Sequence, residues 1–184
     1  MPDSPSFSDL DKGRNAYKKG NYKIAFGEFK VLAEQGHTGS QFSLGNMYAK
    51  GQGTIQDYKE AIHWFTKSAE QGDAGAQYYL GYIYGNDPKM THDYNAAFHW
   101  YTKAAEKGHS VAQLNLGVMY IKGQGTIQDH VRAHMWWNIA ASLGNDASAQ
   151  RYRDQVEDDM TPSQLEQALT LGRECVAKVY KNTG

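Results

Sequence analysis

The sequence KGQGTIQD at Lys50–Asp57 recurs unchanged at Lys122–Asp129, which is 72 residues further along the chain. Halfway between these stretches, Asn86–Asp93 reads NDPKMTHD and shares almost nothing with them. The spacing fits a repeat of 36 residues whose middle copy has a different loop, provided that the flanking sequences repeat at the same interval.

The flanking sequences do repeat every 36 residues, and no insertion is needed to keep them in step. A fixed period of roughly 20–50 residues is typical of proteins built from stacked structural repeats. The chain is therefore predicted to be a tandem array. The recurring positions are Leu44, Leu80 and Leu116; Gly45, Gly81 and Gly117; Tyr48, Tyr84 and Tyr120; Ala61, Ala97 and Ala133; Trp64, Trp100 and Trp136; Ala69, Ala105 and Ala141; and Gly36, Gly72, Gly108 and Gly144.

Each repeat is predicted to be a pair of helices. In the first helix, Ser40, Leu44 and Tyr48 follow one another at four-residue intervals and share one face. Gly51 and Gly53 then end this helix, because glycine costs about 1 kcal/mol inside a helix and readily adopts left-handed backbone angles.

The second helix begins after an aspartate. Asp57 is a suitable N-cap, and Glu60 three residues later would complete a capping box. Phe65 lies on the apolar stripe of this helix, and Gly72 closes it as a C-cap. One such hairpin cannot bury both of its apolar faces, so neighbouring hairpins must stack. The predicted fold class is an all-α solenoid.

The recurring residues form the frame A-x-x-x-L-G-x-x-Y-x-x-G-x-G-x-x-x-D-x-x-x-A-x-x-W-[FY]-x-K-[SA]-A-E-x-G, which resembles the Sel-one-like repeat of the tetratricopeptide superfamily. The resemblance implies a right-handed superhelix with repeats at 38–73, 74–109 and 110–145. The second repeat departs from the frame where Asp87 and Lys89 replace the loop glycines. We expect the same hairpin there with a different turn, which Pro88 makes rigid.

The two ends resemble the family more loosely, and residues 1–184 are expected to form a single repeat domain. Residues 6–37 look like a plain tetratricopeptide unit with a short turn at Gly20-Asn21-Tyr22. Residues 146–184 look like helices that cap the array. In this region Thr161 is a suitable N-cap, Pro162 suits the first helical position, and Gln164 can complete a capping box.

Composition excludes several classes of function. The net charge is −1 and the lysines are scattered among acids, so no nucleic-acid surface is expected. No stretch approaches the ~18–20 apolar residues of a membrane span. The N-terminal MPDSPSFSDLD is not a signal peptide, which favours the cytoplasm, although a trimmed periplasmic or secreted form stays open.

No catalytic or cofactor chemistry is expected, and the enzyme interpretation is a minor alternative. His130 and His134 have the i, i+4 spacing that can place two ligands on one metal, but Asp129 is expected to cap a helix instead of joining them. Cys175 is the single cysteine, so no intramolecular disulfide can form, and we interpret it as a buried, inert thiol. No cofactor or metal is therefore predicted.

The resemblance implies a protein-interaction module, since the first helix of each tetratricopeptide-like unit lines a concave groove. We predict a monomer that binds a protein or peptide there as an adaptor or regulator. The alternative is an immunity-type protein that neutralises a bacterial toxin or effector. Transferred by the frame, the partner-binding residues are Arg14, Tyr17 and Lys18; Phe42, Asn46 and Lys50; Tyr78, Tyr82 and Asn86; and Leu114, Val118 and Lys122.

Overall fold

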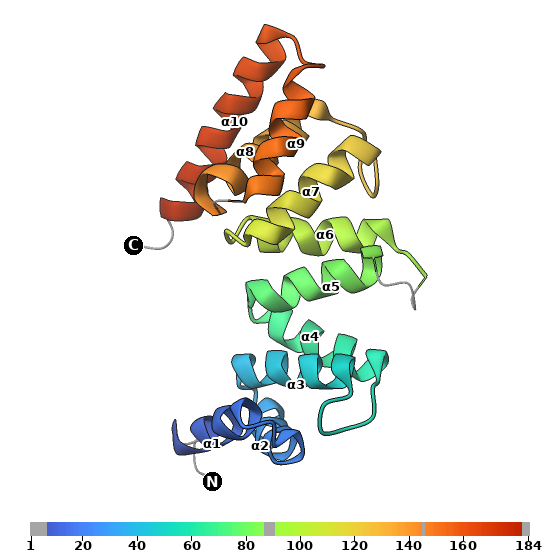
Figure 1. The fold of residues 1–184 in the computed structure, drawn as a ribbon, viewed down its shortest axis with the longest axis vertical. Helices are drawn as coiled ribbons and strands as arrows, with labels where there is room; N and C mark the ends of the chain where they lie inside the picture. Colours follow the sequence, from blue (N-terminus) through green and yellow to red (C-terminus); the bar gives the residue numbers. More distant parts are fainter. Residues whose placement is uncertain (1–6, 87–90, 145, 182–184) are drawn as a thin grey trace. The chain divides into compact units, whose positions relative to one another are not determined.

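The computed structural model describes residues 7–86, 91–144 and 146–181 (Figure 1). These residues contain ten helices and no strand, so the all-α repeat solenoid is confirmed. The helices are α1 (Phe7–Lys18), α2 (Tyr22–Glu34), α3 (Thr38–Lys50), α4 (Tyr58–Glu70), α5 (Ala74–Asn86), α6 (Tyr94–Ala105), α7 (Ser110–Lys122), α8 (His130–Gly144), α9 (Ala147–Glu157) and α10 (Pro162–Lys181).

The chain divides into two compact units, Met1–Gln77 and Tyr78–Gly184, with the division inside α5. Consecutive helices pair into hairpins within each unit, as α1 with α2 and α7 with α8 show (Figure 1). None of the helices within the described ranges has the length and apolar character that crossing a membrane requires.

The loops of the three repeats close in the same way. In the first repeat the Asp57 carboxylate accepts the N–H groups of Lys59 and Glu60, at 2.8 and 3.1 Å, so the predicted N-cap is confirmed. The Asp57 N–H donates to the carbonyl of Tyr48 at 3.0 Å, and so it is used by the preceding helix instead of by the Glu60 side chain that we predicted.

The same loop-closing bond runs from Asp93 to Tyr84 at 2.9 Å and from Asp129 to Tyr120 at 3.0 Å. The second repeat therefore keeps the 36-residue register although its loop sequence differs. Pro88, to which we assigned the rigidity of that loop, lies outside the described residues.

A glycine of the first helix lies against an aromatic ring of the second helix in every hairpin of the repeats. A Cβ added to Gly45 would lie 2.8 Å from Cδ1 of Phe65, and one added to Gly81 would lie 2.6 Å from Cδ1 of Tyr101. Protein atoms do not pack this closely, so only glycine allows this separation of the helices. The equivalent contacts are Gly13 with Phe29 in the N-terminal hairpin and Gly117 with Trp137 in the third repeat.

A buried glutamine that the sequence analysis missed connects successive hairpins. It lies near the start of the first helix and donates from Nε2 to a carbonyl at the end of the preceding second helix. This carbonyl also accepts the backbone N–H of the glycine that follows its helix, so the glutamine adds a second hydrogen bond that links the two hairpins. The pairs are Gln41 with Ala33 (3.2 Å), Gln77 with Ala69 (2.9 Å) and Gln113 with Ala105 (3.1 Å).

The recurrence of Trp64, Trp100 and Trp136 in phase predicts that all three are packing residues of the core, but the three are not equivalent. Trp64 and Trp136 are buried, whereas Trp100 is only half-buried. Its neighbour Tyr101, which is in phase with the buried Phe65 and Trp137, lies in the core, with 1% of its surface exposed and its ring against Gly81. The ammonium of Lys103 lies 5.1 Å from the centre of the Trp100 ring and covers part of its outer face.

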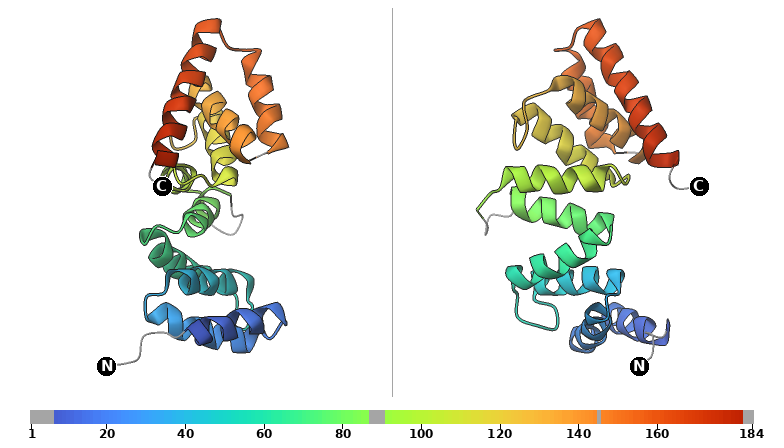
Figure 2. Two further views of the ribbon diagram at one scale, coloured as in Figure 1. Left: turned by 90° about the vertical axis from the view of Figure 1, so that its left-hand side faces the viewer. Right: turned by 180° about the vertical axis from the view of Figure 1, so that it is seen from behind.

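The capping box predicted at Thr161 and Gln164 is confirmed. The Thr161 hydroxyl accepts the Gln164 N–H at 3.3 Å, and the Gln164 side chain accepts the Thr161 N–H at 2.9 Å, so α10 begins with a capping box. His37 and His109 each accept a backbone N–H at the start of the next helix. Figure 2 shows α10 running along the end of its unit, where it packs on α8.

Adding a methyl group at Gly45 should destabilise the protein, because it would overlap the ring of Phe65. We expect Gly45→Ala to lower the free energy of unfolding by about 1–3 kcal/mol, the usual cost of overpacking a core. The measurement is urea unfolding followed by circular dichroism.

Gly27→Ala is the matched control for this experiment. Gly27 also lies inside a helix, but an added Cβ meets nothing within 4 Å. This substitution should raise stability by roughly 0.5–1 kcal/mol, through helix propensity alone. Equal effects of the two substitutions would show that the glycine–aromatic contact does not matter.

Candidate functional site

A pocket of about 360 Å³ opens on the second unit between α7, α8 and α9. Helix α8 packs against both α7 and α9 (Figure 1). We call α8 the floor of the pocket and α7 and α9 its walls. The lining is mainly apolar with a few polar groups, as is usual for binding pockets. Its residues are Val118, Ile121 and Lys122 from α7, His130 and Trp137 from α8, and Tyr152, Gln155, Val156 and Asp159 from α9 and the turn after it.

The aromatic part of the pocket is held in one position. The Trp137 indole N–H donates to the carbonyl of Leu114 at 3.0 Å, and the ring lies against Gly117. The ring of Tyr152 is tilted by 36° to Trp137, with 5.3 Å between ring centres. Trp137 is 4% exposed and Tyr152 is 41% exposed, so the pocket presents one fixed ring and one accessible ring.

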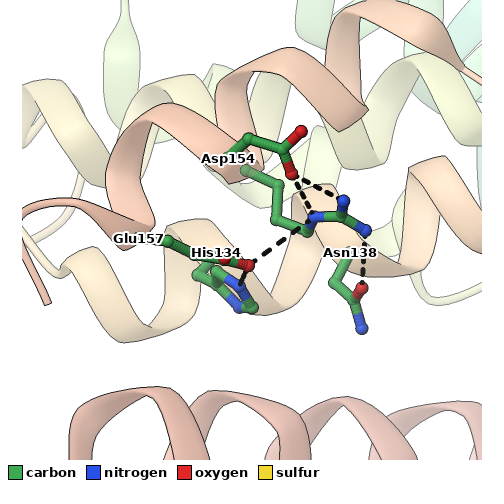
Figure 3. A network of polar contacts seen from close by, with 5 residues as sticks. His134, Asn138, Asp154 and Glu157 are labelled. Carbon is green, nitrogen blue, oxygen red and sulfur yellow. Dashed lines mark hydrogen bonds and ion pairs between the residues drawn. The ribbon is translucent and has the colours of Figure 1, made fainter. Parts of the chain in front are cut away.

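Helix α9 is fastened to α8 by a polar network (Figure 3). The buried His134 contacts the Glu157 carboxylate through Nε2 at 2.7 Å. Arg153 approaches the same carboxylate at 3.7 Å and donates to Asn138 at 3.3 Å and to Asp154 at 2.6 Å. Because Tyr152 and Val156 lie on the same helix, this network also fixes one wall of the pocket.

The two histidines with metal-ligand spacing have different surroundings. His134 faces Glu157 in the buried network, whereas His130 lines the pocket, and Asp129 caps α8 by accepting the Arg132 N–H at 2.9 Å. The described residues contain no group of three or more His, Cys, Asp or Glu side chains that could hold a metal ion.

Three predicted partner-binding residues lie at or beside the pocket. Val118 and Lys122 line it directly, and Leu114 is half-buried one turn before Val118. The carbonyl of Leu114 also accepts the hydrogen bond from the Trp137 indole N–H. The frame therefore brings its predicted positions in the third repeat to one site.

The predicted residues of the second repeat have mixed roles. Tyr82 is 40% exposed, as a contact residue should be. Tyr78 is half-buried and stacks on the His109 ring, with 4.6 Å between centres and 14° between planes. Asn86 donates from Nδ2 to the Tyr101 hydroxyl at 2.8 Å.

Since Tyr78 is not a frame position, the frame also predicts that packing of the repeats does not need it, and this prediction is wrong. The frame places Tyr78 outside the repeat core, but the next repeat brings His109 against it, and this neighbour lies 31 positions away in sequence. Burial raises the pKa of Tyr78, and it raises that of Tyr101 strongly, as expected for phenols packed into a core.

The predicted residues of the first unit also divide into two groups. Arg14, Lys18 and Lys50 are exposed. The others take part in contacts inside the unit. The Tyr17 hydroxyl donates to the Gln52 side chain at 2.9 Å. The ring centres of Phe42 and Phe65 are 5.9 Å apart. Asn46 donates to the Phe42 carbonyl at 3.2 Å.

Cys175 is half-buried, whereas we predicted a buried residue. It lines a second cavity of about 810 Å³ together with Met135, Trp136 and Leu171, and residues of α6 and α7 also contribute to the lining. Burial, with a smaller contribution from Glu106, raises the pKa of the Cys175 thiol against the opposing effect of Lys178. This shift disfavours the nucleophilic thiolate.

Four lining residues were missed by the sequence analysis because they lie beyond the last repeat. Tyr152, Gln155, Val156 and Asp159 belong to a region that we predicted only as a cap. The i, i+4 pair of Tyr152 and Val156, one aromatic and one aliphatic, was the available signal for an apolar face.

Comparisons with known proteins agree with the repeat frame. The Sel1 repeat matches residues 38–73, 74–109 and 110–145. A Sel1 repeat protein from Oxalobacter formigenes is similar in structure, with a TM-score of 0.63 and 36% identity over 70% of this chain and 96% of that one. A protective antigen of uropathogenic Escherichia coli with an SLR fold gives a TM-score of 0.53 and 29% identity, over 95% of this chain and 46% of that one.

Two curated relatives share shorter segments. An exopolysaccharide production negative regulator of Rhizobium leguminosarum bv. viciae is 50% identical over 50 residues, which are 27% of this chain and 19% of that protein. A protein of the same description from Rhizobium meliloti (strain 1021) is 40% identical over 55 residues, 30% of this chain and 20% of that protein. The similarity thus spans about a fifth of each regulator.

Removing the Glu157 carboxylate should loosen α9. In Glu157→Ala the buried Nε2 of His134 loses its partner, and Nδ1 of the same ring is already buried without one. We expect a loss of about 1–3 kcal/mol in the free energy of unfolding. Glu166→Ala removes an exposed glutamate from α10 and should change stability by less than about 0.5 kcal/mol. Equal stabilities in denaturant titrations would contradict this role of the network.

Proposed function

Because the chain belongs to the Sel1 repeat family, we propose that it is a non-enzymatic adaptor or regulator that binds a peptide segment of a protein partner in the pocket between α7, α8 and α9. One observation carries this proposal. Val118 and Lys122, which the repeat frame assigns to partner contact, line a pocket with a fixed aromatic floor.

The size and the lining of the pocket suit a side chain of a peptide. Ligand pockets span about 300–1,000 Å³, and this one lies near the lower end. Val118, Ile121 and Trp137 offer an apolar surface that one anchoring side chain can cover. Anchors of this kind supply most of the binding energy in protein interfaces, because they are fully removed from water.

Further contacts are available on the same unit. Tyr82 presents a ring that is 40% exposed, and rings lose little conformational entropy when a partner fixes them. We assign Tyr78 a supporting role, since its own ring is stacked on His109. In the first unit Arg14 and Lys50 remain candidates for contacts to a partner, because both are exposed.

The names of the relatives support a regulatory role over the immunity role. Both curated relatives are described as negative regulators, and proteins of the repeat family suggest protein–protein interaction. The matched segments cover only about a fifth of each regulator, so exopolysaccharide production is not assigned to this chain.

A charge placed in the pocket should abolish peptide binding without unfolding the protein. We expect a phage-displayed library of random peptides to yield binders on the wild-type protein and none on Val118→Glu, because a buried carboxylate opposes an apolar anchor. Val111→Glu is the matched control: it changes the same residue type on the same helix at a position that is 39% exposed. Peptides that bind Val118→Glu as tightly as Val111→Glu would show that the binding site lies elsewhere.

The two tyrosines of α5 should separate stability from binding. Tyr78→Ala should cost about 1–3 kcal/mol of stability, because it removes the stacked ring from His109. Tyr82→Ala should leave the melting temperature nearly unchanged. If Tyr82 is a hot spot, its loss should weaken a selected peptide by about 2 kcal/mol, or roughly 30-fold. Thermal melts and fluorescence anisotropy measure the two effects, and full affinity of Tyr82→Ala would remove this residue from the site.

A further inference from the structure

Two opposite charges border the apolar pocket. Lys122 ends the α7 wall, and Asp159 follows the α9 wall. Both residues are exposed, and within the described ranges neither one takes part in an ion pair. Their charges are therefore available to a ligand that enters between the two walls.

Two of the neighbouring acids, Asp129 and Glu157, are already engaged. Asp129 caps α8 and lies 3.7 Å from Arg132. Glu157 contacts His134 and Arg153 in the polar network that joins α9 to α8. His130 and Tyr152 are the other titratable residues that line the pocket. Lys122 and Asp159 thus provide the charges that distinguish one wall from the other.

The ends of the two wall helices increase this difference. The carboxyl end of a helix carries a partial negative charge, which a basic residue in the last turn offsets. Helix α7 has Lys122 in its last turn, whereas α9 has no basic residue there and is followed by Asp158 and Asp159. The α9 wall therefore attracts a cation, and the α7 wall attracts an anion.

We infer that the pocket recognises a peptide in which an apolar anchor side chain is flanked by an acidic residue, seated at Lys122, and by a basic residue, seated at Asp159. This inference rests on the proposed function and adds the chemistry of its ligand. Charges around an apolar anchor fix the register and orientation of a ligand and exclude ligands with the reverse order. The same pocket without these charges would accept any apolar side chain.

The test is to reverse each charge and to repeat the peptide selection. Wild-type protein should select peptides with an apolar residue between an acid and a base. Lys122→Glu should select peptides in which a base replaces the acid, and Asp159→Lys should select peptides in which an acid replaces the base. The leading wild-type peptide should bind each variant at least about 10-fold more weakly, and its charge-reversed counterpart should recover the affinity.

Two matched controls separate local from general charge effects. Asp158→Lys makes the same change at the neighbouring residue, which does not line the pocket, and Lys59→Glu reverses an exposed lysine on α4. Both should select the wild-type motif. Peptides that bind in the pocket without any charge preference, or whose preference is the same in all variants, would overturn this inference alone. If the wild-type protein selects no peptide that depends on Val118, the proposed function fails as well.

Discussion

The contact between a glycine and an aromatic ring sets the geometry of each hairpin, and the other features of the structure follow from it. Gly45 and Gly81 leave room for the rings of Phe65 and Tyr101, so the two helices approach more closely than side chains would allow. At Gly117 the ring is the larger indole of Trp137, which reaches the Leu114 carbonyl and forms the floor of the pocket. The same glycine–aromatic contact therefore packs the core of the repeats and positions the ring that forms the floor of the pocket.

Two kinds of hydrogen bond support this arrangement, one within each hairpin and one between successive hairpins. The loop aspartates return the chain to the preceding helix at a fixed place, and the buried glutamines bind the end of the previous hairpin. After the third repeat these devices stop, and α9 is held instead by the network around Glu157. The pocket forms where the last repeat meets α9, which is held by this polar network instead of by the hydrogen bonds of the repeats.

The sequence predicts the local features because they depend on near neighbours. The period, the hairpins and the caps at Asp57 and Thr161 follow from spacings of a few residues, or from a repeat that can be counted. The stacking of Tyr78 on His109 joins two successive hairpins, so the frame could not predict it. Nothing in the frame distinguishes the half-buried Trp100 from the buried Trp64 and Trp136. Of the pocket lining, Val118 and Lys122 are among the predicted contact residues, since α7 belongs to a repeat and α9 does not.

The most direct measurement of where a ligand binds is nuclear magnetic resonance of the methyl-labelled protein with a selected peptide. Intermolecular contacts should run from the apolar side chain of the peptide to the methyl groups of Val118 and Ile121 and to the indole of Trp137. The loop residues Ile55 and Ile127 are 87% and 86% exposed and offer the peptide an alternative apolar surface. Contacts to these two isoleucines, with none in the pocket, would contradict the account.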